Sequence, residues 1–278
     1  MDNRPIGFFD SGLGGLTSIP YLREQLPEER VIYFGDTART PYGSKAVTTI
    51  RRFSAEIAEF LVKCNVKMIV IACNTVSATC LGELRDRFPK IPIVGIIAPA
   101  AEEIAASCGS SSRVGIIGTK VTIASHAYRD SVQQMQPSLD IYEQACPAFV
   151  PLIEEGIIKN DIMDMTIRHY MDGFVSENRL DTLVLGCTHY PLIQENLSRI
   201  YPDVRIVNPS SIVIGRIRRI LTERGELAQD SDFTDVFYAS DLSENFINMI
   251  DHIFEDSGEK KVKFLNFDLE KEKANGLL

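Results

Sequence analysis

Two segments of the sequence share one pattern, in which a short apolar run ends in a cysteine followed by two hydrogen-bonding residues. The first reads Met-Ile-Val-Ile-Ala-Cys-Asn-Thr over residues 68–75, and the second reads Leu-Val-Leu-Gly-Cys-Thr-His over 183–189. Each apolar run is typical of a parallel strand that is buried on both faces. Ligands bind at the carboxyl ends of such strands in open α/β sheets, so the polar residues are candidates for a site.

The two cysteine segments belong to a weak internal repeat. Each is preceded, at a similar distance along the chain, by another predicted strand that opens a βα unit, Ile6–Asp10 in one case and Val114–Gly118 in the other. A repeat of this length indicates two similar structural units. We therefore expect an α/β fold with two similar three-layer lobes, whose mainly parallel sheets face a central cleft flanked by Cys73 and Cys187.

Composition limits the classes of function. The 278 residues, 45% hydrophobic and 24% charged, suit one large or two modest globular domains. No apolar run reaches the roughly 18 residues of a membrane span, and no secretory signal precedes the first strand, so we expect a cytoplasmic protein without membrane contact. A net charge of −9 argues against nucleic acid as a partner, although a local site can still bind a small anion.

The cysteines and histidines do not form a metal-binding pattern. Six cysteines in a chain without an export signal should be reduced thiols. The sequence has no Cys-x-x-Cys pair, and its four histidines are scattered without a His-Glu-x-x-His helix. We therefore expect no metal site.

Further polar residues follow other predicted strands. Asp10 closes the first strand and leads into the glycine-rich turn 11–15, which lacks the third glycine of a dinucleotide fingerprint and the lysine of a P-loop. Its glycines let the backbone approach a ligand, and the helix start offers N–H groups to an anion. A plain tight turn is the alternative interpretation. Thr119 could bind a ligand or only cap a helix, and Glu154 could be catalytic or only a solvated helix end.

The expected organisation has three parts. Residues 1–98 together with 209–255 form the first lobe, which carries Cys73, and 99–208 form the second lobe, which carries Cys187. Residues 256–278 are rich in charge and are expected to be a surface tail.

Two equivalent cysteines on opposite sides of a cleft favour a two-base proton transfer. A nucleophilic cysteine normally needs its own histidine base, and only Cys187 has one nearby. In the two-base alternative, one thiolate removes a proton from carbon and the other thiol delivers one from the opposite face. The pKa of a thiol, ordinarily about 8.5, lies close enough to neutral pH for a cysteine to act as either base or acid. Asp10 is the candidate proton partner of Cys73, and His189 or Glu154 that of Cys187.

The sequence resembles the glutamate racemases, a branch of the Asp/Glu racemase family, from Ile6 to about Phe254. Any one of the matching motifs is weak, but in this order and at these spacings they are highly specific. The matching segments are residues 9–15, 35–43, 72–75, 149–156 and 186–191.

The resemblance implies a cofactor-independent isomerase that interconverts L- and D-glutamate and supplies D-glutamate for peptidoglycan and cell-wall synthesis. Cys73 would act on the D enantiomer and Cys187 on the L enantiomer, and a homodimer is expected. Proton transfer would be assisted by Asp10, Glu154 and His189. The implied substrate-binding residues are Asp10, Ser11, Tyr42, Gly43, Asn74, Thr75, Thr119, Thr188 and His189.

Other functions remain open from the sequence. Aspartate racemases share the two-cysteine plan but tend to have glutamate after the second Cys-Thr, so His189 and the loop 41–43 favour glutamate. A non-catalytic two-lobe binding protein predicts that Cys73→Ser and Cys187→Ser keep ligand binding. A thiol redox protein predicts a reversible disulfide between the same residues.

The motifs offer no clear cationic partner for the two carboxylates of glutamate. Arg39 is the only arginine in a motif loop, and its simplest interpretation is a charge on the protein surface. We expect backbone N–H groups of residues 42–43 and of the helix starts after both cysteines to bind the carboxylates.

Overall fold

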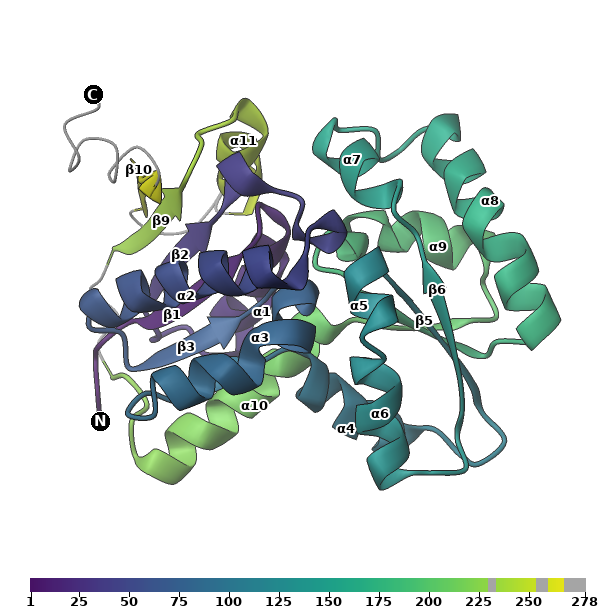
Figure 1. The fold of residues 1–278 in the computed structure, drawn as a ribbon, viewed down its shortest axis with the longest axis horizontal. Coiled ribbons are helices and arrows are strands. Elements are labelled where there is room, and N and C mark those ends of the chain that lie inside the picture. The colour runs from purple at the N-terminus through teal and green to yellow at the C-terminus, as the bar shows by residue number, and fades with distance from the viewer. Residues whose placement is uncertain (230–233, 254–259, 268–278) are drawn as a thin grey trace.

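The computed structural model of the chain describes residues 1–229, 234–253 and 260–267, and these form an α/β fold with two parallel sheets (Figure 1). The larger sheet contains β1 (Ile6–Asp10), β2 (Val31–Gly35), β3 (Met68–Ile71), β4 (Ile93–Gly95), β9 (Asp235–Ala239) and β10 (Lys260–Phe264). The smaller sheet contains β5 (Arg113–Gly118), β6 (Asp140–Ala145), β7 (Thr182–Gly186) and β8 (Arg205–Val207). Their spatial orders are β10-β9-β2-β1-β3-β4 and β6-β5-β7-β8. The α/β class with parallel sheets expected from the sequence is confirmed.

Helices cover both faces of the larger sheet, because its strands are apolar on both sides. Phe9 and Ile71 pack on one face against α2 (Val47–Lys63) and α3 (Asn74–Arg87). Phe8 and Val70 pack on the other face against α1 (Ile19–Gln25) and α10 (Pro209–Arg224). In Figure 1, α2 and α3 lie in front of β1 and β3.

The smaller sheet is built in the same way. Val114 and Val184 continue the core that contains α1 and α10, and they pack with α4 (Ile97–Ser107) and α6 (Ala127–Met135). Leu183 and Leu185 lie on the opposite face. There they join a separate core with α7 (Phe149–Glu154), α8 (Asp161–Asn178) and α9 (Gln194–Ile200). One hydrophobic core therefore covers one face of the larger sheet and one face of the smaller sheet.

The remaining elements are short. They are α5 (Lys120–Ala124), α11 (Glu244–Ile253) and 3₁₀ helices at Gly14–Ser18, Thr37–Arg39, Tyr42–Ser44 and Tyr190–Ile193. No helix within the described ranges has both the length and the apolar character needed to cross a membrane.

The strand register places the expected functional residues at sheet edges. Phe9 pairs with Ile71, so Asp10 and Cys73 leave the larger sheet at the same carboxyl edge. Gly118 pairs with Gly186, so Thr119 and Cys187 leave the smaller sheet at its carboxyl edge.

The C-terminal region differs from the expected separate tail. Lys260–Phe264 forms β10, which pairs in parallel with β9 and extends the larger sheet. In the segment 260–264 the apolar residues Val262 and Phe264 alternate with lysines, a pattern typical of a strand. The expectation of a tail considered only the charges of the segment. Residues 256–259 and 268–278 of that tail lie outside the described residues. The boundaries of the two lobes stay a prediction.

Candidate active site

Asp10 is a buried carboxylate held at the carboxyl edge of the larger sheet. Its Oδ2 accepts hydrogen bonds from the backbone N–H groups of Gly12 at 3.2 Å and Gly15 at 3.1 Å. Its Oδ1 accepts one from the Thr188 hydroxyl, which follows the second cysteine, at 3.3 Å. Burial raises the pKa of Asp10, although the charge of His189 and these hydrogen bonds oppose the rise. Asp10 therefore connects the glycine-rich turn to the second cysteine motif, and its pKa lies above that of an ordinary aspartate.

The glycine-rich turn after Asp10 allows the close approach of the second sheet. A Cβ on Gly14 would lie 2.5 Å from Nδ1 of His189 and 2.6 Å from the Thr188 hydroxyl. These separations are too short for non-bonded atoms, so a side chain at position 14 would push the two motifs apart. The turn is therefore required by packing between the two sheets as well as by local geometry.

Cys73 lies at the start of α3 with 4% of its surface exposed. Its sulfur is 3.7 Å from the Ser11 hydroxyl. Burial raises the pKa of this thiol strongly, and the negative charge of Asp10 adds to the rise. A charge on Cys187 raises it further, so the two thiols are electrostatically coupled. Cys73 therefore rests as a neutral thiol.

The second cysteine has a different partner. The Cys187 sulfur lies 3.9 Å from Nδ1 of His189, and Nε2 of the same ring lies 3.0 Å from Oε1 of Glu154. Burial alone would lower the pKa of His189, but the hydrogen bonds to Cys187 and Glu154 and the charge of Asp10 raise it to about 10. When Cys187 is a thiolate, His189 is therefore favoured as an imidazolium that can deliver a proton to the sulfur.

Three hydroxyls join the two sheets beside Cys73. The Thr75 hydroxyl lies 3.1 Å from that of Thr119 and 3.2 Å from that of Thr122. The Thr119 hydroxyl also accepts from the backbone N–H of Thr122 at 3.3 Å, so it caps α5 and contacts the site residue as well. The capping interpretation of Thr119 is confirmed, and ligand binding by Thr119 stays a prediction.

Asn74, which directly follows Cys73, has an unsatisfied hydrogen-bond donor in its side-chain amide. The side chain is 2% exposed, and its Nδ2 has no hydrogen-bond partner among the described residues. A buried amide N–H without a partner is costly. It is the kind of group that an anionic ligand would satisfy.

The loop after β2 approaches the smaller sheet at Gly43. A Cβ there would lie 2.3 Å from Cβ of Thr119, so only glycine permits this contact. The neighbouring Tyr42 is fully buried, and its hydroxyl donates to the Asp36 carboxylate. Tyr42 therefore anchors the loop through its side chain, which leaves its backbone as the part predicted to contact a ligand.

Arg39 is not the surface charge that the sequence suggested. Only 10% of its side chain is exposed. Its Nε donates to Asp36 at 2.8 Å and its Nη1 to Glu56 at 2.7 Å, and its guanidinium stacks on Phe53 at 4.0 Å. The aromatic face and the two carboxylates shield it from solvent. Arg39 holds the loop, which leaves backbone N–H groups as the expected carboxylate donors.

Sequence reasoning missed several residues around the site. Asp36 and Ser240 follow β2 and β9 at the same edge as Asp10, and the Ser240 hydroxyl donates to Asp36 at 2.7 Å. The rule that strand ends meet at one edge could have found both. Tyr128 donates to Oδ1 of Asn74 from within α6, and no local pattern marks it.

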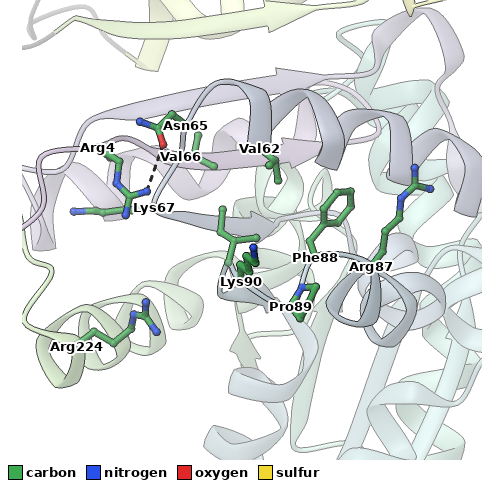
Figure 2. A pocket seen from close by; sticks show the side chains of 11 residues that line it. Arg4, Val62, Asn65, Val66, Lys67, Arg87, Phe88, Pro89, Lys90 and Arg224 are labelled. Atoms are coloured by element: carbon green, nitrogen blue, oxygen red, sulfur yellow. Dashed lines mark hydrogen bonds between the residues drawn. The ribbon is translucent and has the colours of Figure 1, made fainter.

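A pocket of about 390 Å³, shown in Figure 2, lies away from these residues. It is lined by Arg4 and Lys67, which precede β1 and β3 and so mark the amino ends of those strands. Arg4 pairs with Asp2 at 2.6 Å, and Lys67 pairs with Glu29 at 2.6 Å. Because Arg4 and Lys67 lie at the amino ends of their strands, the pocket is at the opposite edge of the larger sheet from Asp10 and Cys73 and is not part of the candidate site.

A second pocket, of about 260 Å³, adjoins the candidate site. It is lined by Gly43, Thr119 and Lys120 together with residues of the 146–151 segment. The loop 41–44 and the start of α5 therefore border a space next to two of the predicted substrate-binding residues, Gly43 and Thr119.

The assembled groups can perform acid–base chemistry at a carbon atom. Each thiol comes from the carboxyl end of its own strand, and each has a separate titratable neighbour, Asp10 for Cys73 and His189 with Glu154 for Cys187. Different proton partners on two thiols suit removal of a proton by one and delivery by the other.

The chain is similar to known proteins over most of its length. Residues 19–216 match a family described as Asp/Glu/Hydantoin racemase. A glutamate racemase of Geobacter metallireducens is 43% identical over 252 residues, which cover 90% of this chain and 92% of the relative. A glutamate racemase of Sulfurihydrogenibium sp. is 42% identical over 245 residues, or 87% of this chain and 93% of that relative.

A solved structure extends the similarity to the fold. The crystal structure of a glutamate racemase from Francisella tularensis, in complex with D-glutamate, matches with a TM-score of 0.89 and 34% sequence identity. The match covers 97% of this chain and 100% of the other.

Proposed function

The chain belongs to the Asp/Glu/hydantoin racemase family, and on this premise we propose that it interconverts L- and D-glutamate by two-base proton transfer at Cα, without a cofactor. The curated relatives, similar over nearly their whole length, are glutamate racemases. The observation that carries the mechanism is the pair of buried thiols, Cys73 and Cys187, at the carboxyl ends of β3 and β7.

The reaction from D-glutamate begins at Cys73. Its thiol first passes a proton to Asp10, whose pKa is raised and which lies close enough to influence the sulfur. The thiolate then takes the proton from Cα, and the electron pair of the broken C–H bond moves into the adjacent carboxylate. The thiol of Cys187 donates its proton to the other face of Cα, which gives L-glutamate.

The second half of the cycle resets Cys187. Its thiolate recovers a proton from Nδ1 of His189, and the carboxylate of Glu154 orients the ring through Nε2. In the reverse direction the same groups exchange roles, so that Cys187 removes the proton from L-glutamate. His189 therefore acts as acid in one direction and base in the other.

Binding of the substrate carboxylates depends on N–H donors. We assign one carboxylate to the unsatisfied Nδ2 of Asn74 and to backbone N–H groups at the start of α3. Ser11, Gly43, Thr75, Thr119 and Thr188 complete the proposed contacts, since they come together around Asp10 and Cys73.

The proposed cellular role follows from the product. D-glutamate would be supplied for peptidoglycan synthesis, in the cytoplasm, by a homodimer. The homodimer and the location both come from the resemblance to the glutamate racemases.

A chiral amino-acid assay tests this function. Purified protein is incubated separately with D-glutamate and D-aspartate, with a metal chelator and without pyridoxal phosphate. Formation of L-glutamate supports the proposal. Conversion of aspartate alone would assign an aspartate racemase, and conversion of neither would return the chain to a binding role.

A further inference from the structure

Asn74 is held by a tyrosine from the other half of the molecule. The Tyr128 hydroxyl, in α6, lies 2.5 Å from Oδ1 of Asn74, at the start of α3. Both side chains are at most 2% exposed. The amide oxygen is thus satisfied, while Nδ2 of the same amide has no partner among the described residues.

The chemistry of the two groups fixes which end of the amide is free. Burial raises the pKa of Tyr128, and the charge of Cys187 raises it further, so the phenol keeps its proton and can donate it. An amide has one acceptor end and one donor end. If the amide were reversed, Nδ2 would face the phenol oxygen, and Oδ1 would face the site and repel an anion.

From this contact we infer that Tyr128 is a positioning residue, which orients the Asn74 amide so that Nδ2 faces a substrate carboxylate. The inference rests on the proposed function, because it requires a carboxylate substrate next to Cys73. Tyr128 touches neither the substrate nor the reacting atoms in this account. Its effect passes entirely through Asn74.

A second explanation of the same contact must be separated from this one. Tyr128 follows β5 of the smaller sheet, whereas Asn74 follows β3 of the larger sheet, so the hydrogen bond also joins the two halves of the site. Thr75, Thr119 and Thr122 join them at the same place. If the Tyr128 hydroxyl served only to hold the halves together, its removal would shift the two thiols relative to each other, so kcat would fall at least as much as KM rises.

The division of the effect between KM and kcat separates the two explanations, and a double-mutant cycle tests whether the effect passes through Asn74. Tyr128→Phe removes only the hydroxyl and keeps the buried ring, Asn74→Ala removes the amide, and the third variant carries both changes. KM and kcat are measured for both enantiomers of glutamate. Tyr201→Phe is the matched control, because its hydroxyl donates to Asp172 at 2.6 Å and that aspartate is exposed.

We expect Tyr128→Phe to raise KM for both enantiomers by roughly 5- to 30-fold, the effect of losing one buried hydrogen bond, with a smaller change in kcat. The double variant should be no worse than Asn74→Ala alone, since the tyrosine then has nothing to orient. Tyr201→Phe should behave as the unchanged protein.

Two results would overturn the inference alone. These are an unchanged KM in Tyr128→Phe, or effects of the two substitutions that multiply in the double variant, while the unchanged protein racemises glutamate. An unchanged protein that does not act on glutamate would instead overturn the proposed function, and the inference with it. Thermal unfolding of each variant identifies any loss that arises from poor folding.

Discussion

Nε2 of His189 lies 3.0 Å from Oε1 of Glu154, while Nδ1 on the other side of the ring faces the sulfur of Cys187. The imidazole therefore links a partly exposed carboxylate to a buried thiol, with 25% of the Glu154 side chain exposed. Cys73 has no such link to an exposed carboxylate, since the polar groups that influence it are the Ser11 hydroxyl, the backbone N–H of Val76 and the buried Asp10. The two bases are equivalent in position but differ in how they exchange protons with solvent.

Loss of the His189 imidazole should slow both directions of the reaction. We expect His189→Gln to lower kcat/KM by about 10²- to 10⁴-fold, the usual contribution of a positioned acid–base group. Because the two enantiomers are equally stable in water, kcat/KM must fall by the same factor from each side. Steady-state assays in both directions measure this.

The matched control is His126→Gln. His126 pairs with Glu143 at 2.6 Å, but its side chain is 51% exposed. Its replacement should leave kcat/KM unchanged. An equal loss in both variants would show that His189 does not act as an acid–base group in the reaction.

The raised pKa of His189 predicts a pH dependence of stability. Its pKa is about 10 in the folded protein, whereas an unfolded histidine titrates near 6.5. Because the folded value is the higher one, the stabilisation is complete below pH 6.5 and is lost as pH rises through 10. The free energy of unfolding, measured with urea between pH 6.5 and 9.5, should therefore fall more in the unchanged protein than in His189→Gln. Parallel curves for the two proteins would contradict the charged imidazole.

Gly43 offers a test of the contact between the loop and α5. Gly43→Ala would place a Cβ 2.3 Å from Thr119, so the loop must move away from the site. We expect KM for glutamate to rise about tenfold or more, which corresponds to about 1.4 kcal/mol of lost binding.

The control for this substitution lies in α3. A Cβ on Gly82 would have none of the described atoms within 4 Å, so Gly82→Ala meets no obstacle. It should leave KM unchanged and stabilise the helix by about 0.5–1 kcal/mol. Comparable KM values in the two variants would show that loop packing does not influence substrate binding.

Arg39 should contribute to stability more than to substrate binding. Arg39→Ala removes the buried ion pairs of this guanidinium with Asp36 and Glu56, and breaking such a pair typically costs about 3–5 kcal/mol. Arg51 pairs with Glu83 on the surface, so Arg51→Ala should cost about 1 kcal/mol or less. Urea unfolding measures both values. A folded Arg39→Ala protein that no longer binds glutamate would show that this arginine holds the substrate directly.

The positions of Asp10, Cys73 and Cys187 could be predicted from the sequence, because each follows an apolar run and parallel strands end at one edge. The hydrogen-bond partners could not be predicted in the same way. Tyr128 lies inside an amphipathic helix, where an aromatic residue normally signals only core packing. It meets Asn74 through the arrangement of the two sheets, which no local pattern encodes.

The error for Arg39 has a similar origin. A charged residue in a polar loop is usually exposed, and its burial here depends on Glu56 and Phe53, which come from α2. For β10, the alternation of apolar residues was present but short, and the surrounding charges outweighed it. In both cases the deciding contacts come from another helix or strand, which the pattern of the segment itself does not encode.

The central claim is that two different thiols handle the proton on opposite faces of Cα. The most direct measurement is proton NMR of the protein with D-glutamate in D₂O, followed from the earliest turnovers. We expect L-glutamate to appear with deuterium at Cα while the remaining D-glutamate keeps its proton. Deuterium that enters both enantiomers equally at early times would indicate a single base and would contradict the two-thiol mechanism.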